Sequence, residues 1–94
     1  MTKREIIKDV SDKTGIEGKK AEIIIEAFMN SVKEHLLRQE KVSFRRFGNF
    51  VVKKRAAKIA QNISKGTSIN VPAYYIPVFK PSTEFKKAVK KTVQ

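Results

Sequence analysis

Basic side chains are concentrated in the second part of this chain, where they could bind a long polyanion. The 94 residues carry a formal net charge of +12. Residues 1–40 hold eight Lys or Arg and eight Asp or Glu, whereas residues 41–94 hold thirteen basic side chains against one acid, Glu84. A surface that serves only solubility usually mixes both signs. The segregation therefore favours a polyanionic partner, nucleic acid ahead of an anionic membrane surface, with a basic solubilising surface as the plainer alternative.

Residue types that could perform enzymatic chemistry are scarce. The chain has one histidine, His35, within a predicted helix, and no cysteine. We find no nucleophile, paired acids or glycine-rich phosphate loop at useful spacing, and no cluster at metal-ligand spacing. Asp9 with Lys13, and Glu34 with Arg38, stand four residues apart, which predicts exposed ion pairs on helices. We therefore expect no enzyme, no cofactor and no metal.

Two helices are predicted in the electrically neutral first part. Thr2 and Glu5 have the spacing of a capping box, and Gly15 is a suitable stop for the helix that begins there. After a connector at residues 16–18, a longer helix presents an apolar stripe at helical spacing. The stripe consists of Ala21, Ile24, Ile25, Phe28, Val32 and Leu36.

The hydrophobic pattern changes to that of strands after Glu40. Val42 and Phe44 alternate with polar neighbours, residues 45–48 suit a turn, and residues 49–55, "NFVVKKR", favour a second strand. Residues 69–80 are again strand-like, although their prolines prefer an edge or a bulge. Ser82 can cap a last helix, with Phe85 on its apolar side.

Residues 56–73, "AAKIAQNISKGTSINVPA", contain no acid, no aromatic residue and few large aliphatic ones. A structureless loop of that length is uncommon in a compact domain. With strand character on both sides, the stretch could be such a loop, in disordered form, or a two-stranded ribbon that turns near residues 62–66. At about 3.3 Å per residue, such an arm would project roughly 30 Å.

The chain is short for a self-sufficient core once that stretch is set aside. Because no disulfide or metal can supply further stability, we expect oligomerisation. No apolar run approaches the length of a membrane helix, and residues 1–10 become acidic too soon for a signal peptide. We expect an intracellular, cytoplasmic protein without membrane association.

Four short motifs resemble the HU/IHF family of bacterial DNA-bending proteins, with HU as the nearer branch. They are "FGNF" at 47–50, "KKRAAK" at 53–58, "VPA" at 71–73 and "PVFKP" at 77–81, and the similarity extends over the whole chain. It implies an α+β fold and an intertwined dimer: a helical base, a saddle of β-strands and protruding ribbon arms. The chain would be one domain, with residues 1–40 as the base, 41–80 as the saddle with arm 56–73, and 81–94 as the last helix.

The resemblance also implies which residues bind double-stranded DNA and which build the dimer. The arms would enter the minor groove and bend the duplex, as is typical of the architectural proteins of this family. Arm cations would be Lys53, Arg55, Lys58 and Lys65, with Arg46, Lys80, Lys86 and Lys3 as further contacts and Gln61, Asn62, Ile63 and Ser64 at the tip. The dimer core would contain Phe28, Phe44, Phe47, Phe50 and Phe79. For Lys90 and Lys91, a solvated helix face and a DNA contact remain open.

The arm tip departs from the common family pattern. Gln61-Asn62-Ile63 stands where most members have Arg-Asn-Pro, and Thr83 stands where a lysine is frequent. Isoleucine is among the residue types that wedge between base steps, so we expect Ile63 to intercalate. It must lose rotamer freedom that a proline ring does not have, and the missing arginine removes one cation from the groove.

Several functions remain open from the residues. The favoured one is a histone-like architectural protein of the nucleoid that bends and compacts DNA with little sequence preference, as a homodimer, with bent, nicked or junction DNA preferred. An IHF-like binder with preferred sites is the alternative. RNA binding would call for exposed aromatics, for which Tyr74 and Tyr75 are the candidates. A helix-turn-helix regulator built on residues 2–40 would need a basic recognition element, and this region has no net charge.

Overall fold

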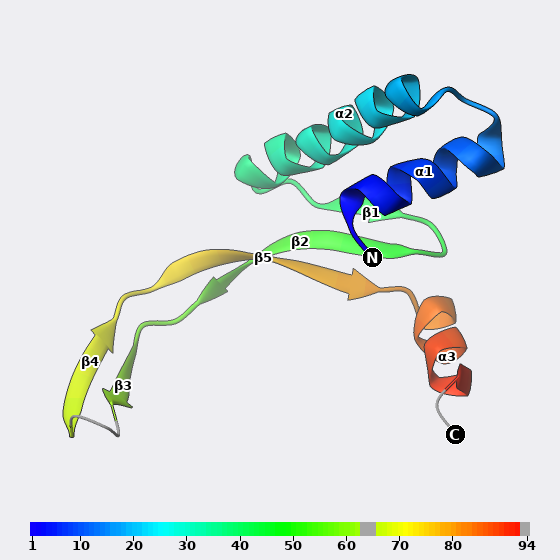
Figure 1. Ribbon diagram of the computed structural model, residues 1–94. Helices are drawn as coiled ribbons and strands as arrows, with labels where there is room; N and C mark the ends of the chain where they lie inside the picture. Colours follow the sequence, from blue (N-terminus) through cyan, green and yellow to red (C-terminus); the bar gives the residue numbers. More distant parts are fainter. Residues whose placement is uncertain (63–65, 93–94) are drawn as a thin grey trace. The chain divides into compact units, whose positions relative to one another are not determined.

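A computed structural model of the chain describes the backbone of residues 1–62 and 66–92 and, except at Gln61 and Asn62, their side chains (Figure 1). The described residues form three helices and five strands. They divide into two units, residues 1–34 and residues 35–94. The predicted wedge Ile63, with Ser64 and Lys65, lies outside the described residues.

The first unit contains α1 (Lys3–Thr14) and most of α2 (Gly18–Leu37). The backbone N–H of Glu5 donates to the Thr2 hydroxyl at 3.3 Å, and that hydroxyl donates to the Glu5 carboxylate at 3.2 Å. Gly15 ends α1 in the left-handed conformation, at φ 74°, and its N–H donates to the Ser11 carbonyl at 2.9 Å. A residue with a Cβ is strained at that φ, so glycine is the natural stop. The cap by the Thr2 hydroxyl and the Gly15 stop are confirmed, whereas the Glu5 carboxylate accepts the Thr2 hydroxyl and not the backbone N–H that a full capping box predicts.

One of the two predicted helix ion pairs is present and the other is replaced. Lys13 contacts Asp9 at 2.8 Å, which confirms the first pair. Arg38 was predicted to pair with Glu34, but α2 ends at Leu37, and the Arg38 guanidinium donates instead to Glu40 at 3.1 Å. Residues four apart face each other only within a helix, and Arg38 lies beyond the end of α2. Its side chain is therefore not placed beside that of Glu34.

Little of the apolar surface is buried within a single chain. Among the described residues, Ile7 and Ala21 are the only buried hydrophobic ones. In the stripe of α2, Ile24 is 56% exposed and Phe28 is 48% exposed. An exposed stripe of this kind requires a further surface to cover it. In the part of the chain that the structure describes, no helix is long and apolar enough to cross a membrane.

The second unit contains a three-stranded antiparallel sheet in the order β1-β2-β5, formed by β1 (Val42–Phe44), β2 (Gly48–Arg55) and β5 (Tyr74–Pro81). Pro77 lies in β5, which is an edge strand of this sheet, as its missing N–H requires. Ser82 follows β5 and accepts the Phe85 N–H at 3.1 Å, so it caps α3 (Thr83–Thr92) as predicted.

The stretch between β2 and β5 is a two-stranded antiparallel ribbon. It consists of β3 (Lys58–Asn62) and β4 (Thr67–Val71), and its register runs from Lys58 opposite Val71 to Asn62 opposite Thr67. Figure 1 shows β2 leading into β3 and β4 leading into β5, so the ribbon continues the β2–β5 pair. The pairing of the predicted arm is confirmed; residues 63–65 of its predicted turn lie outside the described residues.

At Gly48, strands β2 and β5 approach each other closely. A Cβ added at this residue would lie 2.5 Å from the Lys80 carbonyl oxygen and 2.7 Å from the ring of Phe79. Real Cβ atoms do not approach backbone so closely, and therefore the pairing of β2 with β5 at this point depends on glycine.

Candidate nucleic-acid interface

The register of the three-stranded sheet sorts its side chains into two faces. Residues directly opposite each other in an antiparallel pair project to the same face, and successive residues alternate. One face, called the apolar face here, carries Val42, Phe44, Phe50, Val52, Lys54, Tyr75, Pro77 and Phe79. The other, called the basic face, carries Ser43, Asn49, Val51, Lys53, Arg55, Tyr74, Ile76, Val78 and Lys80.

Packed aromatic rings hold the apolar face together. The ring of Phe50 lies 4.9 Å from that of Phe79 and 6.1 Å from that of Phe44, measured between centroids. Phe47, in the turn between β1 and β2, lies 5.0 Å from Phe79 and stacks on Phe85 of α3 at 5.7 Å with an interplanar angle of 19°. Ring pairs at these distances are favourable beyond their burial.

The ring cluster joins four of the five predicted core phenylalanines within one chain. Phe28 belongs to α2, in the other unit. Phe85 is a member that the sequence interpretation missed, because it was assigned only to the apolar side of its own helix. Its position three residues after the capping Ser82 could have indicated that it faces back toward the sheet. Phe47 remains 46% exposed in the single chain, so part of the ring cluster is accessible to solvent.

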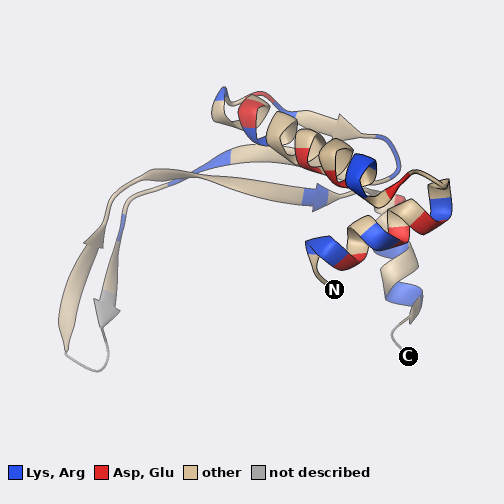
Figure 2. Cartoon of the chain, turned by 45° about the horizontal axis from the view of Figure 1, so that its top comes forward, with Lys and Arg blue, Asp and Glu red and all other residues tan. Residues whose placement is uncertain are grey.

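The basic face brings three predicted DNA-binding residues together on neighbouring strands. Lys53 is paired with Ile76, Arg55 with Tyr74, and Lys80 with Asn49. All three cations are exposed. Figure 2 shows acidic residues on α1 and α2, whereas strands β2, β3 and β5 carry basic ones. No acid of β1, β2 or β5 neutralises this face.

Lys53 and Lys80 are close enough to affect each other. The pKa of Lys53 is lowered from its usual 10.5 chiefly by the neighbouring ammonium group of Lys80, with the Arg55 charge contributing further. Two ammonium groups held near each other favour the arrival of an anion between them. A phosphate group of nucleic acid carries such a charge.

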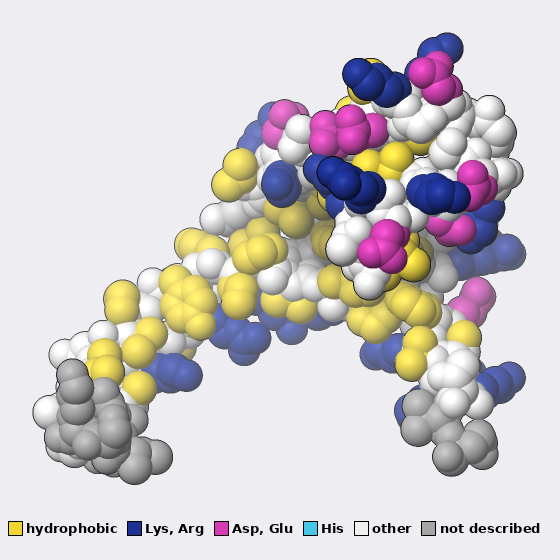
Figure 3. Space-filling view, viewed as in Figure 1, with side chains coloured by type: hydrophobic (Ala, Val, Ile, Leu, Met, Phe, Trp, Pro, Cys, Tyr) yellow, Lys and Arg dark blue, Asp and Glu magenta, His cyan; other side chains and the backbone are white. Residues whose placement is uncertain are grey.

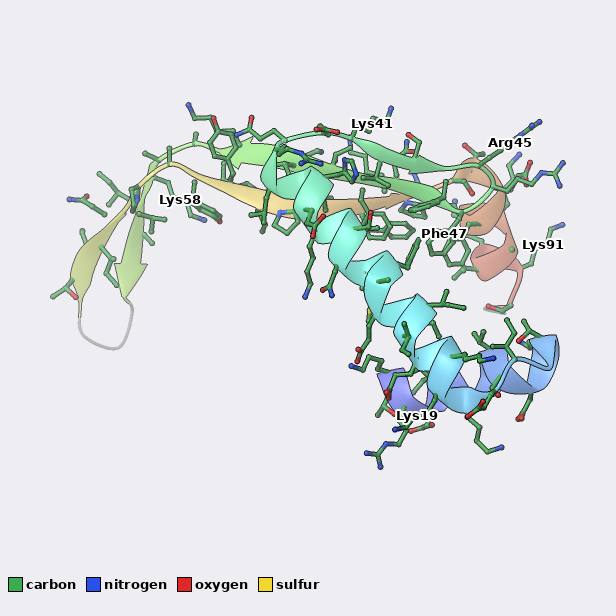
Figure 4. The ribbon with its side chains drawn as sticks, turned by 90° about the horizontal axis from the view of Figure 1, so that it is seen from above. Lys19, Lys41, Arg45, Phe47, Lys58 and Lys91 are labelled. Carbon is green, nitrogen blue, oxygen red and sulfur yellow. The ribbon has the colours of Figure 1, made fainter. Side chains whose placement is uncertain are left out.

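The turn between β1 and β2 presents two arginines at the other end of the sheet. Arg46 has a positive φ of 68°, and the Phe47 N–H closes the turn on the Phe44 carbonyl at 3.1 Å. Arg46 was a predicted contact, and Arg45 was not. Figure 4 shows Arg45 at this turn and Lys58 at the base of the ribbon, at opposite ends of the strands. The cations thus extend along the whole sheet.

The ribbon exposes apolar side chains together with its cation. Ile59 is 71% exposed and Ile69 is 49% exposed, while Lys58 is exposed at the beginning of β3. Hydrophobic side chains on the ribbon surface are visible in Figure 3, beside lysines and arginines of the strands. The backbone pairs Gln61 with Ser68 and Asn62 with Thr67, next to the tip. The predicted side-chain roles of Gln61 and Asn62 lie outside the described residues.

The remaining predicted contacts lie on helices. Lys86 is exposed on α3. Lys3, at the start of α1, is already paired: its ammonium contacts the Glu26 carboxylate at 2.9 Å. This hydrogen bond, and next the Glu26 charge, raise the pKa of Lys3 above its usual 10.5. Lys3 therefore has an acidic competitor for any phosphate, unlike the cations of the basic face.

His35 has a structural partner. Its Nδ1 lies 2.9 Å from a carboxylate oxygen of Glu40, and the Glu40 backbone N–H donates to the His35 carbonyl at 2.9 Å. The hydrogen bond from His35, and more weakly the Arg38 charge, lower the pKa of Glu40 below its usual 4.5. These contacts close the end of α2. Among the described residues, no group of three His, Cys, Asp or Glu could hold a metal ion.

A neutral helical unit and a basic antiparallel sheet that continues into an acid-free ribbon define a nucleic-acid-binding protein of the α+β class. Residues 1–90 match the family described as bacterial DNA-binding protein. The chain is 40% identical over 91 residues to DNA-binding protein HU of Clostridium pasteurianum, covering 97% of this chain and 100% of that protein. It is 36% identical over 89 residues to integration host factor subunit alpha of an Anaeromyxobacter strain, covering 95% and 90%.

A solved structure of an Anabaena HU bound to DNA has the same fold. It aligns with a TM-score of 0.88 at 26% identity, covering 95% of this chain and 97% of that one. The chain belongs to the HU/IHF family of bacterial DNA-binding proteins. The predicted family and α+β fold are confirmed, and so are the predictions that it is an HU-like DNA-binding, DNA-bending protein and that it is not an enzyme.

Proposed function

We propose that this HU-like protein works on double-stranded DNA as a homodimer, with little sequence preference, by placing its two ribbons in the minor groove. The observation that carries the proposal is the ribbon itself: an acid-free antiparallel pair, with exposed isoleucines, that continues directly from a sheet with a basic face. Its role in the cell would be to organise and compact the DNA of the nucleoid. The protein would therefore be cytoplasmic and associated with the nucleoid.

Phosphate contacts would supply most of the affinity. The basic face contributes Lys53, Arg55 and Lys80, and the ribbon contributes Lys58 and Lys65. Each neutralised phosphate releases counterions, so the affinity should fall steeply as salt is raised. Arg46 and Lys86 would hold DNA beyond the ribbon, and Lys3 would do so only by exchanging Glu26 for a phosphate.

A bend requires a residue that opens a base step. Ile63 follows Asn62 in the sequence and is the proposed wedge, with Gln61, Asn62 and Ser64 in the groove beside it. Inserting an apolar side chain partly unstacks a step and kinks the duplex. DNA that is already bent, nicked or branched has met part of that cost, and should therefore bind more tightly.

The dimer is supported by the apolar surface that one chain leaves open. Phe28 on α2 is 48% exposed and Phe47 of the ring cluster is 46% exposed, although both belong to apolar surfaces. A second copy would cover them and build a shared core with Phe44, Phe50 and Phe79. The chain would then act as one domain: base 1–40, saddle 41–80 including arm 56–73, and helix 81–94.

A site-preferring, IHF-like function is the second candidate, because the chain is also 36% identical to an integration host factor subunit. Such a protein would select DNA by its deformability and could use a different partner subunit. Binding to RNA instead of DNA is a further outcome that the same titration can expose.

Energy transfer between dyes at the two ends of a random-sequence duplex tests the proposal. The duplex is used intact and nicked, at two salt concentrations, with wild type and with Ile63→Ala, and an RNA duplex serves as the competitor. We expect wild type to raise the transfer, to weaken with salt, and to lose most bending but little affinity on Ile63→Ala. Binding without bending would reject the wedge, and preference for one sequence would favour the second candidate.

A further inference from the structure

We propose that Tyr74 is a stacking residue for an unpaired base, and that this stacking adds to the preference for interrupted DNA that easier bending supplies. The site is the rung that pairs Tyr74 with Arg55, where the sheet passes into the ribbon. The proposal deepens the proposed function and rests on DNA lying against the basic face.

The register separates the two tyrosines of the chain. Tyr74 and Tyr75 are neighbours in β5, so they project to opposite faces. Tyr75 is paired with Lys54 and shares the apolar face with the Phe50 and Phe79 rings. Tyr74 is on the face of Lys53, Arg55 and Lys80. Only Tyr74 therefore shares a face with the proposed phosphate-binding cations.

The ring of Tyr74 is accessible to a ligand. It is 44% exposed, and in the described part of the chain it stacks on no other ring. The Phe rings, in contrast, pack on one another at 4.9–6.5 Å. An exposed aromatic ring on a strand whose cross-strand partner is an arginine can take a base on its face while the guanidinium contacts the adjoining phosphate.

A gap in one strand provides the ligand that such a ring needs. In an intact duplex both faces of every interior base are already stacked, so the phenol ring gains nothing from approaching them. A gap leaves one base of the continuous strand without a partner and free to turn outward. Stacking of one base on an aromatic side chain changes affinity by about tenfold. Tyr74 should accordingly add a preference of that size for gapped over intact DNA.

The experiment compares two substitutions that differ only in the face they alter. Affinities of wild type, Tyr74→Leu, Tyr74→Phe and Tyr75→Leu are measured for one duplex, intact or with a one-nucleotide gap opposite 2-aminopurine. We expect Tyr74→Leu to weaken binding to the gapped duplex about tenfold and to leave the intact duplex nearly unchanged. Tyr74→Phe should retain the preference because it keeps the ring, and Tyr75→Leu should retain it because it alters the other face.

Fluorescence reports the contact independently of affinity. Since the chain has two tyrosines and no tryptophan, Tyr75→Phe leaves Tyr74 as its only strongly fluorescent side chain. On the gapped duplex, stacking should lower the emission of both Tyr74 and 2-aminopurine. On the intact duplex, the decrease should be smaller for each of them. In Tyr74→Phe, the emission of Tyr75 should respond equally to both duplexes.

The two proposals fail in different ways. If wild type does not bend intact DNA, the proposed function is wrong. If wild type bends intact DNA but Tyr74→Leu keeps the full preference for the gap, or weakens both duplexes equally, the stacking role of Tyr74 is wrong. Loss of the preference in Tyr75→Leu, with Tyr74 present, would also overturn it.

Discussion

The two antiparallel sheets of this chain use the same strand pairing and bury different amounts of surface. The sheet of β1, β2 and β5 has one face of packed phenylalanine rings and one face of cations. The ribbon of β3 and β4 has no ring on either face, and its isoleucines are 71% and 49% exposed at Ile59 and Ile69. Cross-strand hydrogen bonds alone stabilise a two-stranded ribbon only marginally in water.

The difference shows where each sheet obtains its stabilisation. The three-stranded sheet is stabilised by its own apolar face, which leaves its basic face available for a ligand. The ribbon has no comparable face and must gain its burial from something outside the chain, for which the DNA groove is our proposal. Residues with similar chemistry should therefore have different effects in the two sheets.

The largest contrast is expected between Phe79→Ala in the sheet and Ile59→Ala in the ribbon. Removing the Phe79 ring breaks contacts with Phe47 and Phe50, and should lower the free energy of unfolding by about 3 kcal/mol. Removing the exposed Ile59 side chain should change it by about 0.5 kcal/mol or less. Urea denaturation at one protein concentration measures both, because dimer stability depends on concentration. Equal losses would mean that the ribbon has a core of its own.

A smaller loss is expected from Gly48→Ala, since the new methyl group would meet the Lys80 carbonyl and the Phe79 ring. Forcing these strands apart should cost about 2 kcal/mol. Gly18→Ala is the matched control: it lies at the start of α2 and a Cβ there meets nothing within 4 Å. It should be neutral or slightly stabilising. A Gly48→Ala protein as stable as wild type would show that β2 and β5 are not so tightly apposed.

The cations of the two sheets should act alike on DNA and differ from those of α2. Lys58→Met in the ribbon and Lys80→Met in the sheet should each reduce the slope of log affinity against log salt by about 1, through loss of one phosphate contact. Lys19→Met, in the first turn of α2, is the control and should leave the slope unchanged. Titrations at several salt concentrations measure these slopes. A full effect from Lys19→Met would place DNA on the helical unit.

The smallest expected effect is on the protonation of Lys53. Its pKa is lowered by Lys80, so Lys80→Met should raise it toward the usual 10.5, as NMR titration of the lysine side chain would measure. The unfolded chain holds this proton more tightly than the folded one. The contribution of Lys53 to stability is therefore unfavourable at neutral pH and improves as the pH rises through the lowered pKa. Bound DNA should raise the same pKa, and an unchanged value would show that no phosphate lies at Lys53.

Local sequence was sufficient to predict most individual elements. The Thr2 cap, the Gly15 stop and the Ser82 cap depend on hydrogen bonds within a few residues, and each is present. The ribbon could be predicted from composition and its flanking strands. The pair of Glu34 with Arg38 could not, because i,i+4 spacing has meaning only while the helix continues, and α2 ends one residue before Arg38.

Charge segregation, caps and the strand pattern were therefore determined by the sequence itself, since each depends on residue types along a short stretch of chain. The tertiary structure decided which side chains meet across strands: Phe85 on Phe47, Lys53 with Lys80, and Tyr74 opposite Arg55 rather than among the phenylalanines. The physical reason is register. A shift of one residue moves every side chain to the other face, and it is the pairing of strands distant in sequence that fixes this choice.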